Sequence, residues 1–174
     1  MTKVIAICGT HGTGKTTLSY KLAAAYKSLG KSVKIIQEVA RSCPFPLNDK
    51  MTKETALWIY YEHARKELEA KRNNDVVICD RTVFDSFVYA KCAGINEIDE
   101  QHNQAINHTK SSYDQILFVR PDIPLSIDSV RSPDLKFQRD IDRVFNHYMN
   151  EVPCTQIKSS QIFNEEFNWK QYCL

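Results

Sequence analysis

The sequence lacks several features that would assign it to common classes of protein. No apolar run approaches the ~18 residues that a transmembrane helix needs, so we expect no membrane partner. A strand is expected to begin by residue 4, which leaves no room for a signal peptide, and we therefore expect a cytoplasmic protein. The formal net charge of +2 does not by itself imply a nucleic-acid partner. The 174 residues fit one domain, 1–174, without repeats or a linker.

The six cysteines form no recognisable metal-binding or disulfide pattern. None belongs to a C-x-x-C pair, and no histidine cluster completes a zinc pattern. Cys8 and Cys79 each end an apolar run, where a small buried hydrophobe fits well. We therefore expect reduced thiols without a metal or disulfide role.

The strongest positive signal lies near the start of the chain. An apolar run from Val4 to Cys8 predicts a buried strand, and the next segment, GTHGTGKT, fits G-x-x-x-x-G-K-[ST] at every fixed position. A helix is expected from Lys15, ended by Gly30, with one apolar face made of Leu18, Leu22, Ala25 and Leu29. Strand, glycine-rich loop and helix together predict a binding site for a nucleoside triphosphate.

The chemistry of such a loop gives each part a role. Its glycines allow positive φ, so that backbone N–H groups converge on a phosphate. Lys15 would reach the β- and γ-phosphates, and the Thr16 hydroxyl would bind Mg²⁺. The predicted ATP-binding residues are Gly9, Thr10, His11, Gly12, Thr13, Gly14, Lys15, Thr16 and Thr17.

Beyond the loop, short apolar strands alternate with helices. Strands are predicted at 32–37, 75–79 and 115–119, with a last edge strand at 155–158, and helices at 52–73, 83–93, 97–111 and 135–150. Segment 42–50, with two prolines, is expected to be an ordered loop. Thr52 is the expected N-cap of the helix at 52–73, whose expected buried stripe is Leu57, Tyr61, Ala64 and Leu68. The alternation predicts an α/β fold, a parallel sheet with helices on both faces and ligands at the carboxyl ends of its strands.

Polar residues follow two of these strands. Asp80 ends an apolar run as a Walker B aspartate does and would support Mg²⁺; the alternative is a cap on the next helix. Arg81 would clamp a phosphoryl oxygen or a substrate anion, or else form a surface ion pair. Glu38 has the position of a general base for a substrate hydroxyl, or of a residue that braces a loop. Arg41 would steer a substrate anion or pair with Glu38.

Two absences favour transfer to a substrate over hydrolysis. Asp80 is followed by Arg81 and not by the Glu that activates water in many mechanical ATPases. No N-K-x-D sequence is present to read guanine.

Arginines and aromatic residues supply the remaining candidates. Arg131 and Arg139, with Arg143, surround an expected flap that would close over ATP; surface pairing is the alternative. Trp58 would stack on a planar ring in a pocket, although aromatic residues at helical spacing also fit a core.

The order of these motifs resembles that of a known group. GTHGTGKTT, EVAR after the second strand, CDR after the third and DSVRS in the flap are similar to P-loop kinases of the nucleoside and nucleotide kinase group. The likeness extends in particular to the ribosylnicotinamide-kinase domain of the bacterial NAD-biosynthesis regulator and to its AAA-labelled, often phage-encoded relatives. It covers Lys3 to about Tyr148 and implies a three-layer fold with a sheet ordered 2-3-1-4-5 and an Arg-bearing lid at roughly 121–140.

The resemblance also implies site roles. Deoxynucleoside kinases carry an acidic base after the second strand, which corresponds to Glu38, and an acid-Arg-Ser triplet after the third, to which Asp80-Arg81-Thr82 is similar. Ser129 departs from the Gly that relatives often have in the lid.

The sequence thus predicts an ATP- and Mg²⁺-dependent kinase that transfers the γ-phosphate to a small nucleoside- or nucleotide-like acceptor. One alternative is a kinase acting on a hydroxyl of a base in DNA or RNA, where nucleic acid enters only as substrate; another is a regulatory NTP-binding protein without an acceptor. The oligomeric state stays open, a homodimer included. The predicted catalytic residues are Lys15, Glu38, Asp80, Arg81, Arg131 and Arg139; the predicted substrate-binding residues are Glu38, Arg41, Trp58 and Arg81; the predicted metal ligands are Thr16 and Asp80.

Overall fold

A parallel sheet forms the centre of the protein. The computed structural model describes residues 1–125, 134–166 and 168–173. The five strands are β1 (Lys3–Cys8), β2 (Val33–Ile36), β3 (Val76–Asp80), β4 (Gln115–Arg120) and β5 (Thr155–Lys158). Each strand pairs in parallel with its neighbours, in the order β2-β3-β1-β4-β5. The predicted strands and the predicted order are therefore confirmed.

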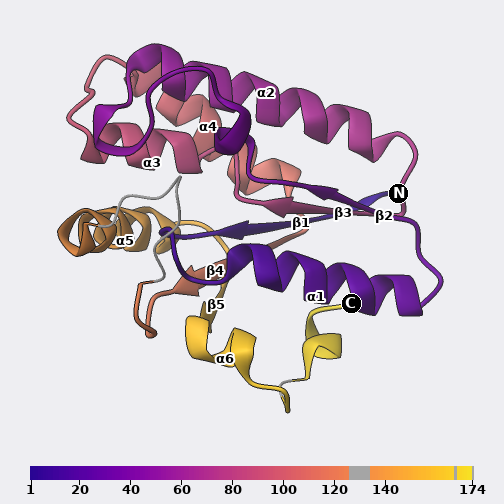
Figure 1. The fold of residues 1–174 in the computed structure, drawn as a ribbon. Helices are drawn as coiled ribbons and strands as arrows, with labels where there is room; N and C mark the ends of the chain where they lie inside the picture. The colour runs from indigo at the N-terminus through magenta and orange to yellow at the C-terminus, as the bar shows by residue number, and fades with distance from the viewer. Residues whose placement is uncertain (126–133, 167, 174) are drawn as a thin grey trace.

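Helices cover both faces of this sheet (Figure 1). Successive side chains of a strand point to opposite faces, so one strand supplies two cores. Ile5 and Ile7 of β1 belong to a buried cluster on the side of α1 (Lys15–Ser28), to which α6 (Ser159–Phe163) adds Ile162. On the other face, Val4, Ala6 and Cys8 of β1 belong to a cluster built with α2 (Lys53–Lys71), α3 (Asp85–Cys92), α4 (Asp99–Ser112) and α5 (Leu135–Met149). The three-layer α/β architecture is as predicted.

The helix after the glycine-rich loop has the predicted boundaries but a partly different buried face. It begins at Lys15, and Gly30, at φ +76°, follows its C-cap. Leu18 and Leu22 are fully buried as predicted, but Leu29 is 55% exposed, so that part of the prediction is wrong. Because α1 ends at Ser28, Leu29 lies past its last turn and cannot extend the apolar face.

The buried stripe predicted for α2 is wrong at two of its four positions, since Leu57 and Ala64 are half-buried against the core but Tyr61 and Leu68 are not. Thr52 caps this helix as expected, and its hydroxyl accepts from the backbone N–H of Thr55. However, Tyr61 is 60% and Leu68 is 69% exposed, whereas the residues that α2 buries include Ile59, His63 and Glu67. The helix is rotated so that two polar residues face inward, and the charge of Glu67 is tolerated there because His108 and Tyr113 donate hydrogen bonds to it.

The described connections contain one predicted break and several short helices. Gly94, at φ +83°, separates α3 from α4 at the predicted position. Three short 3₁₀ helices were not predicted: η1 (Val39–Ser42), η2 (Asn48–Lys50) and η3 (Trp169–Tyr172). Among the described residues, no helix is both long and apolar enough to span a bilayer.

Candidate active site

Polar segments that are distant in the sequence meet at the carboxyl edge of the sheet. Ile7 of β1 is paired with Asp80 of β3, so the segments that follow these two strands leave the sheet at the same level. Arg81 connects them, because its Nη1 lies 3.5 Å from the carbonyl oxygen of Gly9 and its Nε lies 2.5 Å from Oε1 of Glu38, which follows β2. The predicted convergence of the loop, Glu38 and Asp80-Arg81 is therefore observed.

The loop between β1 and α1 has the backbone shape of a phosphate-binding loop. Gly9, Gly12 and Gly14 have φ values of +125°, +73° and +82°. A Cβ atom at Gly9 would lie 2.4 Å from the carbonyl oxygen of Val119 on β4, so this position admits only glycine. The N-terminus of α1 follows Gly14 directly, and its free N–H groups favour an anion there.

Side chains from two other helices hold this loop in place. The side-chain amide of Gln138 on α5 donates from Nε2 to the backbone carbonyl oxygen of His11 (2.8 Å). The backbone carbonyl oxygen of Gln138 accepts from the Thr10 hydroxyl (3.1 Å). The hydroxyl of Tyr89 on α3 lies 3.1 Å from Nδ1 of His11. Thr10, His11 and Thr13 are all buried. The loop is thus preorganised before any ligand arrives.

Lys15 is buried at the first position of α1. Its Nζ donates to the carbonyl oxygen of Thr10 and lies 3.3 Å from the hydroxyl of Thr13. Burial, assisted by the charge of Arg81, lowers the pKa of Lys15 to about 7. A bound polyphosphate would reverse this effect, because nearby negative charge favours the ammonium form.

Thr16 and Asp80 form the oxygen-rich part of the site. The Thr16 hydroxyl donates to Oδ2 of Asp80 at 2.5 Å. Hydroxyl and carboxylate oxygens suit Mg²⁺, which prefers hard oxygen ligands and retains several waters. The alternative role for Asp80, a helix cap, is not observed, because α3 begins after Phe84 and has no side-chain cap. The two residues therefore fit the predicted metal site.

Arg81 lies in an ion cluster and not on the surface. Its φ of +101° is unusual for a residue with a side chain, and this backbone conformation holds the guanidinium between two carboxylates. Besides Glu38, it pairs with Asp85, at 3.2 Å from Nη1 to Oδ2. Only 8% of Arg81 is exposed. The alternative interpretation of Arg81 as a surface ion pair is therefore wrong.

Glu38 is ionised within this cluster. Burial raises the pKa of Glu38, but the opposing charges of Arg81 and Lys15 outweigh it and bring the value to about 2. Arg41 adds a second contact, 3.1 Å from its Nε to Oε2 of Glu38. The predicted alternative for Arg41, pairing with Glu38, is therefore observed, and its role in steering a substrate anion stays a prediction.

Sequence reasoning missed two residues of the cluster, Asp85 and Tyr89. Oδ1 of Asp85 accepts from the backbone N–H and the hydroxyl of Thr82, at 3.0 and 2.6 Å. Burial raises the pKa of Asp85, although the positive charge of Arg81 lowers it in part. Burial also raises the pKa of Tyr89, to about 12. Tyr89 joins the loop to the cluster, since its ring also lies 5.1 Å from the Arg81 guanidinium carbon. The spacing of 81, 85 and 89, one helical turn apart, is the signal that would have found them.

A pocket of about 600 Å³ adjoins the ion cluster. Its lining includes Glu38, Arg81 and Asp85, together with His11 of the phosphate-binding loop. The apolar part of its wall comes from η1, the loop around η2, α2 and α3. This mixture of apolar wall and charged end suits a small, largely planar ligand held beside the loop.

Other predicted site residues do not line this pocket. Trp58 is half-buried and packs against the hydrophobic core, so the structure does not support its predicted substrate contact. Arg139 is exposed on α5, and Arg143 forms the predicted alternative, a surface pair with Asp140 at 3.0 Å. Arg131 lies outside the described residues, as does Ser129, and the roles of Arg131 and Arg139 stay predictions.

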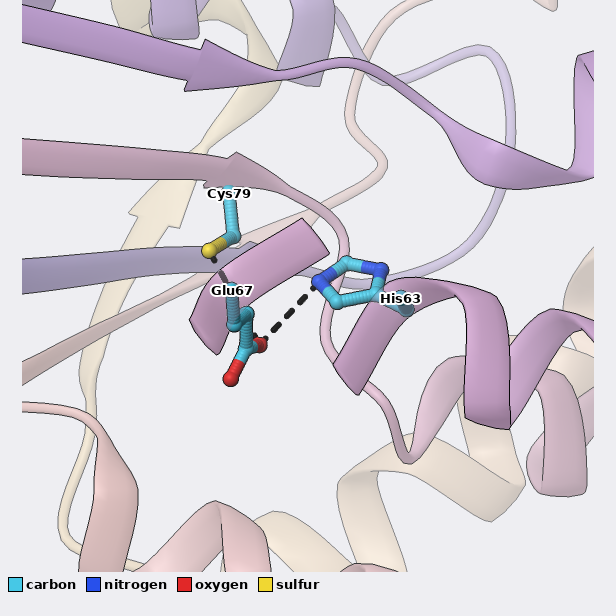
Figure 2. Close-up of side chains that lie close together, drawn as sticks. All are labelled: His63, Glu67 and Cys79. Carbon is cyan, nitrogen blue, oxygen red and sulfur yellow. Dashed lines mark hydrogen bonds and ion pairs between the residues drawn. The ribbon is translucent and has the colours of Figure 1, made fainter. Parts of the chain in front are cut away.

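A buried polar group lies behind the α2 wall of the pocket. Glu67 accepts hydrogen bonds from Nε2 of His108 (2.9 Å) and from the hydroxyl of Tyr113 (2.5 Å). His63 Nε2 lies 3.2 Å and Cys79 Sγ 3.9 Å from Oε1 of Glu67 (Figure 2). Burial raises the pKa of Glu67, but the interactions with His108, His63 and Tyr113 outweigh burial and lower the value to about 2.

This group has the residue types of a metal site but not its chemistry. Ligand atoms of His63, Glu67 and Cys79 lie within 4.8 Å of one another. Both carboxylate oxygens of Glu67 already accept hydrogen bonds, and burial raises the pKa of Cys79 well above its ordinary value. We therefore interpret the group as a hydrogen-bonded network that joins α2, β3 and α4.

Comparisons with known proteins agree with this geometry. The fold and the phosphate-binding loop define a P-loop nucleotide kinase architecture. Residues 4–163 match the family model described as an AAA domain, and the chain therefore belongs to that family.

The individual proteins that resemble this chain have low sequence identity to it. The chain is 28% identical over 160 residues to a probable thymidylate kinase of Methanococcus aeolicus, covering 87% of this chain and 80% of the relative. The structure of deoxyadenosine kinase from M. mycoides with bound dATP has a TM-score of 0.64 at 17% identity, covering 98% of this chain and 97% of that one. The NadR protein in complex with NR has a TM-score of 0.65 at 18% identity, covering 96% of this chain and 45% of that one. The solved structures show that the chain shares its fold with these kinases.

Proposed function

We propose that this protein is an ATP- and Mg²⁺-dependent kinase that transfers the γ-phosphate to a small nucleoside- or nucleotide-like acceptor. The observation that carries the proposal is that one pocket is lined both by His11 of the phosphate-binding loop and by Glu38 and Arg81. An acceptor in that pocket would lie next to the end of the triphosphate. The names of the relatives, a thymidylate and a deoxyadenosine kinase, support the same class of acceptor.

The loop and its lysine would bind the donor. Backbone N–H groups of the loop and of the α1 N-terminus would hold the phosphates, and Lys15 would leave the Thr10 carbonyl to contact the β- and γ-phosphate oxygens. Thr16 and Asp80 would hold Mg²⁺, which, when bound, neutralises charge on the phosphate oxygens.

Glu38 and Arg81 would act at the acceptor. With a hydroxyl acceptor, the new bond forms between the acceptor oxygen and the γ-phosphorus, the bond from that phosphorus to the β–γ bridging oxygen breaks, and the hydroxyl proton passes to Glu38. With a phosphate acceptor no proton has to be removed, and Glu38 would only position it. Arg81, anchored by Asp85, would orient Glu38 in both cases.

A screen with labelled ATP tests the proposal. Purified protein is incubated with Mg²⁺ and, separately, with nucleosides, nucleoside monophosphates and oligonucleotides, and the Lys15→Ala variant serves as the control. We expect label in a nucleoside or a nucleotide and none with the variant. Label only in oligonucleotides, or phosphate release that no acceptor changes, would overturn it.

A further inference from the structure

One polar side chain in the pocket wall keeps an unused hydrogen-bonding atom. His63 of α2 is 1% exposed and lines the pocket. Its Nε2 faces Glu67, at 3.2 Å from Oε1, whereas Nδ1 lies on the opposite edge of the ring (Figure 2). Within the part of the chain that the structure describes, every contact of His63 to a polar group involves Nε2, which approaches Glu67 without the geometry of a hydrogen bond, and none involves Nδ1. The ring therefore offers the pocket one free nitrogen.

His63 differs in this respect from the charged residues of the pocket. Arg81 pairs with both Glu38 and Asp85, so these three side chains largely satisfy one another. Ser86 donates to the carbonyl oxygen of Val83. A ligand that reaches the α2 wall would therefore find Nδ1 of His63 as the side-chain atom whose partner is still missing.

Glu67 determines which nitrogen of His63 carries the proton. The Glu67 carboxylate is ionised, since its pKa is about 2, and an ionised carboxylate only accepts hydrogen bonds. A hydrogen on the nitrogen that faces it, Nε2, is therefore favoured, because Nε2 lies 3.2 Å from this carboxylate. In the neutral ring the other nitrogen, Nδ1, is consequently an acceptor. His108 and Tyr113 hold Glu67 in place, so this tautomer is set by the network behind the wall.

We propose that Nδ1 of His63 accepts a hydrogen bond from the acceptor substrate, and that the pocket therefore favours nucleosides whose ring carries an amino or carboxamide N–H group. The inference rests on the proposed function and narrows its substrate class. His63 is a specificity-determining residue in this scheme, and Glu67 is a positioning residue that acts through His63. The hydroxyl end of the same ligand would face Glu38.

Matched pairs of nucleosides that differ by one N–H-bearing group test the inference. Adenosine is compared with purine riboside, cytidine with its 4-deamino analogue, and nicotinamide riboside with pyridine riboside. For each pair we measure kcat/KM with ATP and, separately, the Kd by calorimetry without ATP. In at least one pair the wild-type protein should prefer the N–H-bearing member by roughly tenfold, the value of one uncharged hydrogen bond. Equal values within every pair would overturn the inference.

Variants then assign the preference to His63. His63→Phe keeps a planar ring without an acceptor and should bring the ratio within the pair close to one, whereas His63→Gln, which retains an acceptor oxygen, should keep part of it. Both kcat/KM values of a pair are measured on the same protein sample, so their ratio does not depend on the fraction of folded protein. The ratio can therefore be measured even in a destabilised variant. Glu67→Gln should lower the ratio, because an amide no longer fixes the tautomer. A full preference in His63→Phe would refute the assignment.

The matched control is His102→Phe. His102 is also buried and packs on aromatic rings of Phe84 and Tyr148, but it does not line the pocket, so its replacement should leave the ratio unchanged. The binding measurement separates the two proposals. A preference in Kd without phosphorylation of any nucleoside would reject the proposed function and retain the inference, whereas binding of no member of any pair would reject the inference.

Discussion

Glu38→Gln probes both the stability of the ion cluster and the chemistry of transfer. Glutamine keeps the shape of the side chain and removes the charge that faces Arg81 and Arg41. The pKa of Glu38 falls from the ordinary 4.5 to about 2 in the folded protein. At 1.36 kcal/mol per pKa unit, the folded state favours the ionised carboxylate by roughly 3 kcal/mol, an upper limit for what the neutral glutamine would lose.

The pH dependence of this contribution follows from its sign. Because the folded pKa is depressed, the contribution of Glu38 is fully present above about pH 4.5 and is lost as the pH falls through about 2. The same depressed pKa means that Glu38 stays ionised in the free enzyme across the neutral range. The profile of kcat/KM should then show no acid limb from this group above about pH 3.

Turnover separates the two kinds of acceptor. With a hydroxyl acceptor, Glu38→Gln should lower kcat by ~10²–10⁴ and change the KM for ATP little. With a phosphate acceptor, the loss in kcat should be much smaller, and the KM of the acceptor should rise. Either result identifies the reacting group of the acceptor.

The assay combines steady-state kinetics with denaturant unfolding at pH 7. The matched control is Glu165→Gln, an exposed carboxylate in the turn after α6, which should change neither rate nor unfolding free energy. Full activity of Glu38→Gln on a hydroxyl acceptor would refute the general-base role. An unfolding free energy equal to that of the wild type would refute the stabilising ion cluster.

Three further predictions concern the loop, the metal ligands and the α2 network. Lys15→Ala should cost several hundred-fold in turnover, equivalent to ~3–4 kcal/mol, while the fold is kept; normal turnover would contradict the ATP site. Asp80→Asn, which alters the carboxylate beside Thr16, should raise the Mg²⁺ concentration needed for half-maximal rate, and an unchanged requirement would contradict the metal role. Burial raises the pKa of Glu67, but the hydrogen-bond donors around it outweigh burial and lower the value from 4.5 to about 2. The contribution of the ionised Glu67 to stability is therefore lost as the pH falls from about 4.5 to 2. Wild-type unfolding free energy should therefore fall more steeply over that range than that of Glu67→Gln, and parallel curves would count against the network.

Local patterns were sufficient to predict the arrangement around the phosphate-binding loop. The loop depends on glycines at fixed spacing, and parallel strands place Glu38 and Asp80 at one edge whatever lies between them in the chain. The strand order came from the family resemblance, because the periodicity of single strands does not reveal which strands are neighbours.

The wall of the pocket depends on contacts that no local pattern contains. Leu57, Tyr61 and Leu68 follow a helical period as well as the residues that α2 actually buries, and the choice between the two faces is made by partners in α4 and after it. Glu67 looks like a surface charge until His108 and Tyr113 are placed beside it. For the same reason His63 could not be recognised as part of the pocket.

Because of the backbone turn at Arg81, the side chains of Asp80 and Arg81 point to different parts of the site. Asp80 faces Thr16, while the next side chain, Arg81, turns towards Glu38 and Asp85. One peptide unit therefore sets the spacing between the proposed metal ligand, Asp80, and the proposed acceptor-site residue, Arg81, and that spacing does not depend on the pocket wall. Much of the wall belongs to other segments, η1, the loop around η2 and α2, which can vary in sequence without moving this turn. We therefore expect related proteins to keep this turn and to differ in the acceptor that they bind. Exchange of the segment from η1 to the middle of α2 between two such proteins should then exchange their acceptor specificities.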